Sequence, residues 1–174
     1  GQEVDLAWAG GLNSAQINTL DVNLDGANDL VIFERTANKV LVFLNEGNRY
    51  VYHPEYETQF PAGISQWILL RDFDCDGRKD LFTANSGISV YRNVTGADKK
   101  LAWEQVFFTN NGIQSAVILS QGFSKTNILP GASDIPNIID IDNDGDLDII
   151  NMRFVPPGTA EFHKNMSMEN TGQC

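Results

Sequence analysis

The chain is short of basic residues, cysteine and histidine, and it lacks any long apolar run. Its 174 residues include 12 Lys and Arg against 23 Asp and Glu, which gives a formal net charge of −11. This charge disfavours nucleic acids and anionic membranes as partners, because both require basic patches. No stretch approaches the roughly 20 apolar residues that a membrane-spanning helix needs. We therefore expect a globular domain without a transmembrane segment.

The few cysteines and histidines limit the chemistry further. Cys75 and Cys174 are too few for a disulfide-rich scaffold and lack the spacing of a zinc site. They could pair with each other, or be one small buried residue and one chain end, and their spacing alone does not decide. His53 and His163 have no recurrent Ser or Cys neighbour. We therefore expect no catalytic residues and a protein that is not an enzyme.

What the chain does contain is a repeated acidic segment. Twelve of the 23 acidic residues fall in three windows, 21–29, 72–80 and 140–148, which read DVNLDGAND, DFDCDGRKD and DIDNDGDLD. Each has Asp at positions 1, 5 and 9, Asp or Asn at position 3, and Gly at position 6. An aliphatic residue follows position 9. This regularity indicates an internal repeat.

The flanking segments repeat as well. Short apolar segments rich in Val, Ile, Leu and Phe precede and follow each acidic window, and they predict strands separated by turns. A third such segment ends each time at an Asn, namely Asn45, Asn93 and Asn165. A fourth strand is expected after the first two, in 50–60 and in 101–108. The predicted fold is all-β, with about three four-stranded β-propeller blades.

These blades would form one domain over residues 1–174, a partial propeller of the seven-bladed type. The repeat units are expected at about 12–60, 61–110 and 130–174, with an insertion at 109–134. The insertion could carry a binding surface or be a passive loop. Trp67 lies in the first strand of its unit, which favours a place in the core. Asn93 and Asn165 match the glycosylation pattern, but their fixed place in the repeat favours a structural role.

The acidic windows have the donor chemistry of a site for a hard cation. Side chains at positions 1, 3 and 5 of a tight loop converge when a Gly at position 6 lets the chain turn sharply. Position 7 would offer its backbone carbonyl, and position 9 would close the site where the next strand begins. Ca²⁺ is favoured over Mg²⁺ by the many carboxylates, and soft metals are disfavoured. The predicted ligands are Asp21, Asn23, Asp25, Ala27 and Asp29; Asp72, Asp74, Asp76, Arg78 and Asp80; and Asp140, Asp142, Asp144, Asp146 and Asp148.

The competing interpretation is an Asx-rich turn, since Asp-Gly alone is a common turn signal. Three copies with the same polar positions favour cation binding, and about three Ca²⁺ ions are expected. Asp146 corresponds to Ala27 and Arg78, so only its carbonyl should reach the metal. Asn23 replaces an Asp, so the first loop is expected to bind most weakly.

The pattern D-x-[DN]-x-D-G-x-x-D-[LI] between short strands resembles the FG-GAP/VCBS repeats of integrin-α-like β-propellers. Residues 7–35 and 134–152 are especially similar to secreted or surface repeat proteins of Bacteroidota. The resemblance implies a non-catalytic, calcium-binding module of a secreted or cell-surface protein, with a structural metal and a role in adhesion to a protein or glycan. The alternative is the non-catalytic propeller part of a larger polysaccharide-active enzyme.

The number of repeats is itself informative. A propeller closes with about four to eight blades, and three leave exposed strand edges, which proteins avoid. We therefore expect further blades of a longer chain, or a partner chain, to cover the open edge.

Overall fold

The structure is a computed structural model, and it describes residues 11–121, 125–131, 133–152 and 158–174. These residues form small antiparallel sheets with one 3₁₀ helix and one short α-helix, so the expected all-β class is confirmed. Within this part of the chain, neither helix is long and apolar enough to cross a membrane.

The first sheet contains the strands β1 (Ala15–Leu20), β2 (Asp29–Glu34), β3 (Lys39–Asn45) and β4 (Tyr50–Tyr52). They pair in sequence order, each antiparallel to the next. The segment 50–60 is only partly a strand, because the 3₁₀ helix η1 (Pro54–Gln59) follows β4. Pro54 explains the change, since its fixed φ suits the first turn of a helix and it has no N–H to donate to a strand ladder.

The second sheet repeats this order with β5 (Ile68–Arg71), β6 (Asp80–Ala84), β7 (Ile88–Asn93) and β8 (Trp103–Gln105). The third sheet contains β13 (Asn137–Ile139), β14 (Asp148–Met152) and β15 (Ala160–His163). It has three strands among the described residues, not the four that were expected. After β15 the chain continues into the helix α1 (Ser167–Thr171).

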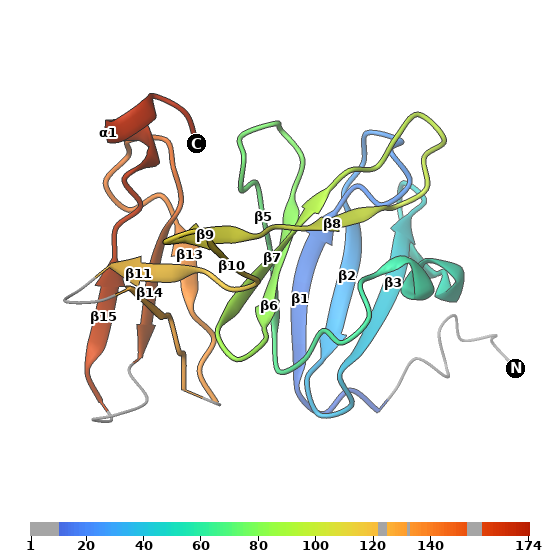
Figure 1. Cartoon of the computed structure of the whole chain (residues 1–174). Coiled ribbons are helices and arrows are strands. Elements are labelled where there is room, and N and C mark those ends of the chain that lie inside the picture. The colour runs from blue at the N-terminus through green and yellow to red at the C-terminus, as the bar shows by residue number, and fades with distance from the viewer. Residues whose placement is uncertain (1–10, 122–124, 132, 153–157) are drawn as a thin grey trace, which may run out of the picture.

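The three sheets stack side by side in sequence order, as Figure 1 shows from right to left. Alternating side chains of the second sheet face opposite neighbours. Ile68 and Leu70 join the core shared with the first sheet, whereas Trp67 and Phe82 join the core shared with the third. Trp67 is only 1% exposed, so its expected place in the core is confirmed. Both faces of the middle sheet are therefore buried, in keeping with its nearly continuous apolar sequence.

The first strands of the three sheets lie next to one another. The side-chain amide of Gln16 on β1 donates to the Ile68 carbonyl at 3.4 Å and accepts from the Ile68 N–H at 3.2 Å. The Arg71 guanidinium on β5 donates to the Ile138 carbonyl on β13 at 3.1 Å. These polar links fix the register between neighbouring sheets, which apolar packing alone does not specify.

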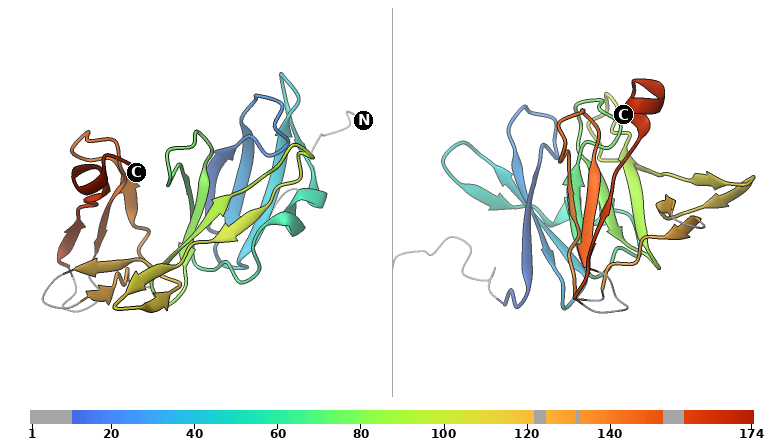
Figure 2. Two further views of the ribbon diagram at one scale, coloured as in Figure 1. Left: turned by 45° about the horizontal axis from the view of Figure 1, so that its top comes forward. Right: turned by 90° about the vertical axis from the view of Figure 1, so that its left-hand side faces the viewer.

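The expected insertion at 109–134 contains most of two hairpins, β9 (Phe108–Asn110) with β10 (Ile113–Ser115), and β11 (Leu119–Gln121) with β12 (Lys125–Asn127). They project on one side of the stacked sheets (Figure 2). The Ile118 N–H donates to the Ile88 carbonyl on β7 at 2.8 Å, and Ile128 is 2% exposed. The insertion is thus packed onto the second and third sheets.

The two cysteines form a disulfide. Cys75 and Cys174 are 99 residues apart in sequence, and their Cα atoms are 6.0 Å apart. The bond joins the acidic loop before β6 to the segment after α1. It therefore ties the second sheet covalently to the end of the third repeat.

Candidate metal centres in the acidic loops

The three acidic loops share one backbone conformation, which the sequence sets locally. The carboxylate at position 1 accepts the N–H groups of positions 5 and 6, at 3.0 and 2.9 Å for Asp21, 3.2 and 3.0 Å for Asp72, and 3.2 and 3.1 Å for Asp140. The Gly at position 6 has φ of 92°, 86° and 105° in the three loops. Other residues rarely adopt this conformation, so the repeated Gly is required by the turn.

Position 9 joins each loop to its sheet. Its carboxylate is almost fully buried and accepts two backbone N–H groups, one from position 2 and one from the fixed Asn at the end of the third strand. The distances are 2.8 and 2.8 Å for Asp29, 2.7 and 2.7 Å for Asp80, and 3.2 and 2.8 Å for Asp148. Burial raises the pKa of Asp80 to about 6 despite these bonds, and it also raises the pKa of Asp29.

The fixed Asn has a structural role in each repeat. Its side-chain oxygen accepts the N–H two residues further on, at 3.1 Å for Asn45, 3.1 Å for Asn93 and 3.2 Å for Asn165. Asn93 is 3% exposed, and its side-chain nitrogen donates to the Lys79 carbonyl. An Asn held in this way forms an Asx turn, which is the role that the repeat favoured over glycosylation.

Carboxylates converge in the second and third loops. One oxygen from each of positions 1, 3 and 9 lies within 4.8 Å of the others, in Asp72, Asp74 and Asp80 and again in Asp140, Asp142 and Asp148. One oxygen of Asp74 is buried without a hydrogen-bond partner, and a buried oxygen of Asp144 has only the Lys164 ammonium near it, at 3.5 Å. Buried anionic oxygens that lack donors fit a cation better than an apolar or uncharged neighbour. The donor set therefore suits a hard metal ion.

The first loop differs at position 3. Asn23 offers an amide where the other loops have a carboxylate, and its side-chain nitrogen donates to Asp25 at 3.0 Å. Position 5 points its carboxylate at the N–H of position 7 in all three loops, at 2.7, 2.8 and 3.1 Å for Asp25, Asp76 and Asp144. Asp144 also approaches Asp142 and Glu169, so a carboxylate of α1 adjoins the third loop. The repeat pattern did not nominate Glu169, because it lies outside the repeated segment.

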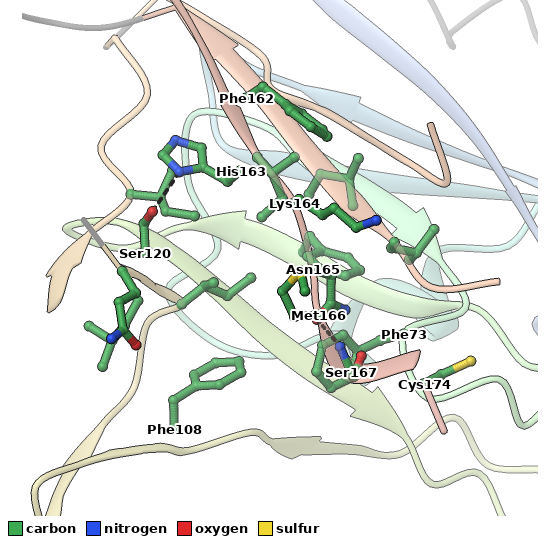
Figure 3. Close-up of a pocket in the computed structure, with 18 residues that line it drawn as sticks. Phe73, Phe108, Ser120, Phe162, His163, Lys164, Asn165, Met166, Ser167 and Cys174 are labelled. Carbon is green, nitrogen blue, oxygen red and sulfur yellow. Dashed lines mark hydrogen bonds between the residues drawn. The ribbon is translucent and has the colours of Figure 1, made fainter. Parts of the chain in front are cut away.

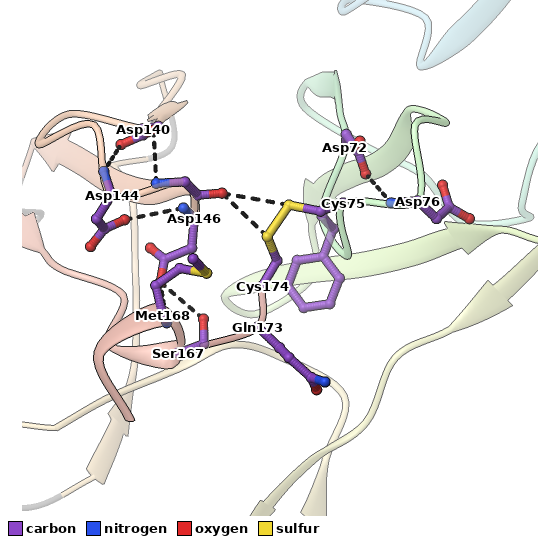
Figure 4. Close-up of a disulfide and its surroundings, with 12 residues drawn as sticks. Asp72, Cys75, Asp76, Asp140, Asp144, Asp146, Ser167, Met168, Gln173 and Cys174 are labelled. Carbon is purple, nitrogen blue, oxygen red and sulfur yellow. Dashed lines mark hydrogen bonds between the residues drawn. A yellow bond between two sulfur atoms is a disulfide. The ribbon is translucent and has the colours of Figure 1, made fainter. Parts of the chain in front are cut away.

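Position 7 was expected to offer only its carbonyl, and its side chains have other partners. Arg78 donates to Asp76 and to the Thr95 carbonyl. Asp146 accepts from the Ser167 hydroxyl at 3.0 Å and from the Met168 N–H at 2.9 Å, so it anchors the first turn of α1 (Figure 4). In the second and third loops, the side chain at position 7 thus connects the loop to a neighbouring segment.

The disulfide lies between the second and third loops (Figure 4). Cys75 occupies position 4 of the second loop, between Asp74 and Asp76. The Gly145 carbonyl of the third loop lies 3.5 Å from the Cys75 sulfur and 3.2 Å from the Cys174 sulfur. Disulfide sulfurs have no proton to donate, so these are close contacts that hold the two loops together.

Basic side chains also reach the loops. The Arg92 guanidinium lies 3.6 Å from a carboxylate oxygen of Asp74. The Lys164 ammonium pairs with Asp142 and Glu169 and lies 3.5 Å from Asp144. Its hydrogen bond to Asp142 is the main reason that the pKa of Lys164 is raised. In the first loop, Lys99 donates to the Leu24 carbonyl at 2.8 Å.

The sequence did not predict the contact between Ser120 and His163. Ser120 on β11 and Nδ1 of His163 on β15 are 2.7 Å apart, beside a cavity of about 660 Å³ between the second and third sheets (Figure 3). Phe73, Phe82 and Phe108 line the same cavity. Burial lowers the pKa of His163. The partner residue lies in the insertion, which has no counterpart in the other repeats, so no repeated signal could have revealed it.

Comparison with known families agrees with this architecture. Residues 21–83 match the model of the FG-GAP-like repeat, a span that runs from the first acidic loop through the second and into β6. The match supports the FG-GAP repeat family and a repeat module built from small antiparallel sheets. No curated protein and no solved structure matches the chain.

Proposed function

We propose that the chain is a non-catalytic repeat module of a secreted or cell-surface protein. In this proposal its three sheets are blades of an integrin-α-like β-propeller, and its acidic loops hold structural Ca²⁺. The module binds a protein or a glycan and serves adhesion. The family match over residues 21–83 supports the repeat module, and the disulfide is compatible with an oxidising, extracellular location.

The observation that carries the proposal is the recurrence of one loop geometry. Two of the loops bring three carboxylates within 4.8 Å, and all three present the same backbone bonds at positions 1, 5 and 9. The loops lie along one edge of the stacked sheets, at the top of Figure 1. In the second and third loops the acid at position 3 accepts no backbone N–H of the described residues, so without a cation it would only add repulsion among like charges that lie close together.

The expected role of the metal is structural. Ca²⁺ is assigned because the loops offer carboxylate, amide and carbonyl oxygens and no thiolate or imidazole. A bound ion would link positions 1 and 3, before the turn, to position 9 at the start of the second strand of each sheet. It would thereby remove the repulsion among the acids and fix the start of that strand.

Thermal unfolding in CaCl₂ and in EDTA tests this proposal. Three sites with dissociation constants of about 0.5 mM would stabilise the fold by about 4 kcal/mol in 5 mM Ca²⁺. For a chain of this size the melting temperature should rise by about 10 °C. MgCl₂ at the same concentration should give a smaller shift. An identical melting temperature in CaCl₂ and EDTA would refute the assignment of calcium.

A matched variant removes the position-3 ligands. Asp74 and Asp142 contact basic side chains and not the loop backbone, so replacing both with Ala should preserve the folded structure in EDTA. The same variant should lose about two thirds of the calcium-dependent rise in melting temperature. A full rise in this variant would show that the ions bind elsewhere.

The open face of the third sheet supports the expectation of further blades. Met152 and Phe162 are 42% and 53% exposed, whereas Ala84 and Val90, their counterparts in the second sheet, are 8% and 0% exposed because the third sheet covers them. We propose that another sheet of the same kind covers this face, from a longer chain or from a partner chain. Exposed apolar patches commonly mark such interfaces.

Self-association offers a test of this surface. If a similar sheet fits the face, copies of the chain should associate at high concentration, and Phe162→Lys should abolish the association. Phe107→Lys is the control, because Phe107 is equally exposed at 54% and lies outside the three sheets. Sedimentation velocity distinguishes the two variants, and equal association in both would contradict the proposal.

A further inference from the structure

Position 3 of each acidic loop and the residue before the fixed Asn vary together across the three repeats. The pairs are Asn23 with Leu44, Asp74 with Arg92, and Asp142 with Lys164. Where position 3 is neutral, the residue before the fixed Asn is also neutral. Where position 3 is acidic, the residue before the fixed Asn is basic. The two members are far apart in sequence, so only the fold brings them together.

The structure shows direct contact in both charged pairs. Arg92 lies at the end of β7 and places its guanidinium 3.6 Å from Asp74. Lys164 follows β15 and pairs with Asp142. Each basic residue therefore lies at or just after the end of the third strand of its sheet. There it is beside the acidic loop that precedes the second strand of the same sheet. The same contact recurs in two repeats, which indicates a property of the repeat and not of one loop.

The surroundings of Lys164 show what the contact does. Oxygens of Asp142, Asp144 and Glu169 lie within 4.8 Å of one another, close enough to hold a metal ion. The Lys164 ammonium contacts all three of these carboxylates. It thus supplies a positive charge to a group of oxygens that could otherwise bind a cation.

We propose that Lys164 and Arg92 are built-in counter-ions that weaken cation binding at the third and second loops. The inference rests on the proposed function, because it concerns the affinity of the same loops for Ca²⁺. An ion that enters either loop must displace or approach a fixed positive charge, and that repulsion lowers the affinity. In the first loop, Leu44 brings no positive charge, and Lys99 donates to the Leu24 carbonyl and not to a loop carboxylate.

This inference changes the expected order of the sites. The sequence alone ranks the first loop weakest, because Asn23 lacks the charge of Asp74 and Asp142. Arg92 and Lys164 offset that same charge in the other two loops. The first loop is therefore no longer expected to fill last. The residue before the fixed Asn therefore contributes to the affinity of each loop, together with position 3 and, in the second loop, with the Arg78–Asp76 ion pair.

Site-resolved titration with CaCl₂ tests the inference. The amide groups of Gly26, Gly77 and Gly145 each donate to the position-1 carboxylate of their own loop, so their signals in ¹⁵N–¹H spectra report the three sites separately. In Lys164→Met, the midpoint for Gly145 should fall about tenfold in Ca²⁺ concentration, and the midpoints for Gly26 and Gly77 should stay constant. Arg92→Met should shift only Gly77.

Two controls separate charge from other effects. Lys164→Arg keeps the charge and should leave the Gly145 midpoint near that of the unmodified chain. Lys125→Met makes the same charge change on β12, which carries no loop carboxylate, and should shift no midpoint. The dispersion of the spectra shows directly whether each variant is folded, and Lys164→Gln serves as a second neutral variant.

The outcomes distinguish this inference from the proposed function. If the glycine signals of the unmodified chain do not respond to 10 mM CaCl₂, calcium binding itself is wrong and the inference falls with it. If they respond but the Gly145 midpoint is unchanged or higher in both Lys164→Met and Lys164→Gln, the loops bind calcium and the counter-ion role is wrong.

Discussion

The second and third acidic loops follow the same backbone, yet position 7 carries Arg78 in one and Asp146 in the other. Arg78 folds back onto Asp76 within its own loop, while Asp146 reaches out to the first turn of α1. Position 4 also differs between the two loops. Cys75 of the second loop forms the disulfide, and the third loop has Asn143 at this position. Positions 1, 6 and 9 therefore determine the loop conformation. Positions 4 and 7 differ between the loops and determine which neighbouring segments each loop contacts.

The largest expected effect comes from separating the two loops. Replacing both cysteines with Ser removes a cross-link between residues 99 apart, which should lower the free energy of unfolding by about 5 kcal/mol in the chain-entropy model. Urea denaturation measures the change. Adding a reductant to the unmodified chain should give the same midpoint as the double variant. A difference below about 1 kcal/mol would mean that packing alone holds the loops together.

The next largest effect is expected at position 9, whose carboxylate makes the same backbone hydrogen bonds in the second and third loops. Asp80→Ala and Asp148→Ala each leave two buried or part-buried N–H groups without an acceptor, so each should cost about 3 kcal/mol in EDTA. Chemical denaturation of both variants tests whether the two loops are equivalent. Asp74→Ala, which removes no backbone bond, is the control. A cost confined to one of the two variants would show that position 9 does not have a common role.

A smaller effect should distinguish position 7. Asp146→Ala removes two hydrogen bonds to the first turn of α1 and should cost about 1–2 kcal/mol. Arg78→Ala removes a partly exposed ion pair and one hydrogen bond to the Thr95 carbonyl, and should cost less, about 0.5–1 kcal/mol. Thermal unfolding in EDTA compares the two. Equal costs would contradict the idea that the third loop is the more firmly attached at this position.

The smallest effect tests the link between the insertion and the third sheet. Ser120→Ala removes the hydrogen bond to His163 and should cost about 1 kcal/mol or less. The ¹⁵N–¹H signals of Gly145 and Gly77 should not move, because the pair contacts neither loop. Movement of the Gly145 signal alone would extend the comparison, since it would connect the third loop to the insertion.

Much of the fold could be predicted because it is encoded locally and three times over. Apolar segments around an Asp-Gly turn define strands, and the repeated Asn marks the end of the third strand in each unit. The predicted ligand positions 1, 3 and 9 follow from the same alignment, and the structure brings their carboxylates together in the second and third loops. Repetition supplied the evidence that a single copy of the loop would lack.

The parts that the sequence left open or did not predict depend on contacts between distant residues. The pairing of Cys75 with Cys174 and of Ser120 with His163 requires the stacking of the sheets, which no local pattern specifies. The third sheet ends at β15 because the segment after Asn165 forms α1, whereas both earlier repeats return as a strand. Glu169 approaches the third loop for the same reason, because it lies on α1.

The middle sheet is covered on both faces, and this has a consequence for how the molecule opens. Amide hydrogens exchange with solvent only when their hydrogen bonds break, and a segment with two buried faces must lose both interfaces before it unfolds. The amides of β6 and β7 should therefore exchange most slowly, at a rate set by global unfolding. The outer sheets need to detach from only one neighbour, so their amides should exchange through partial openings in which the middle sheet keeps its other partner.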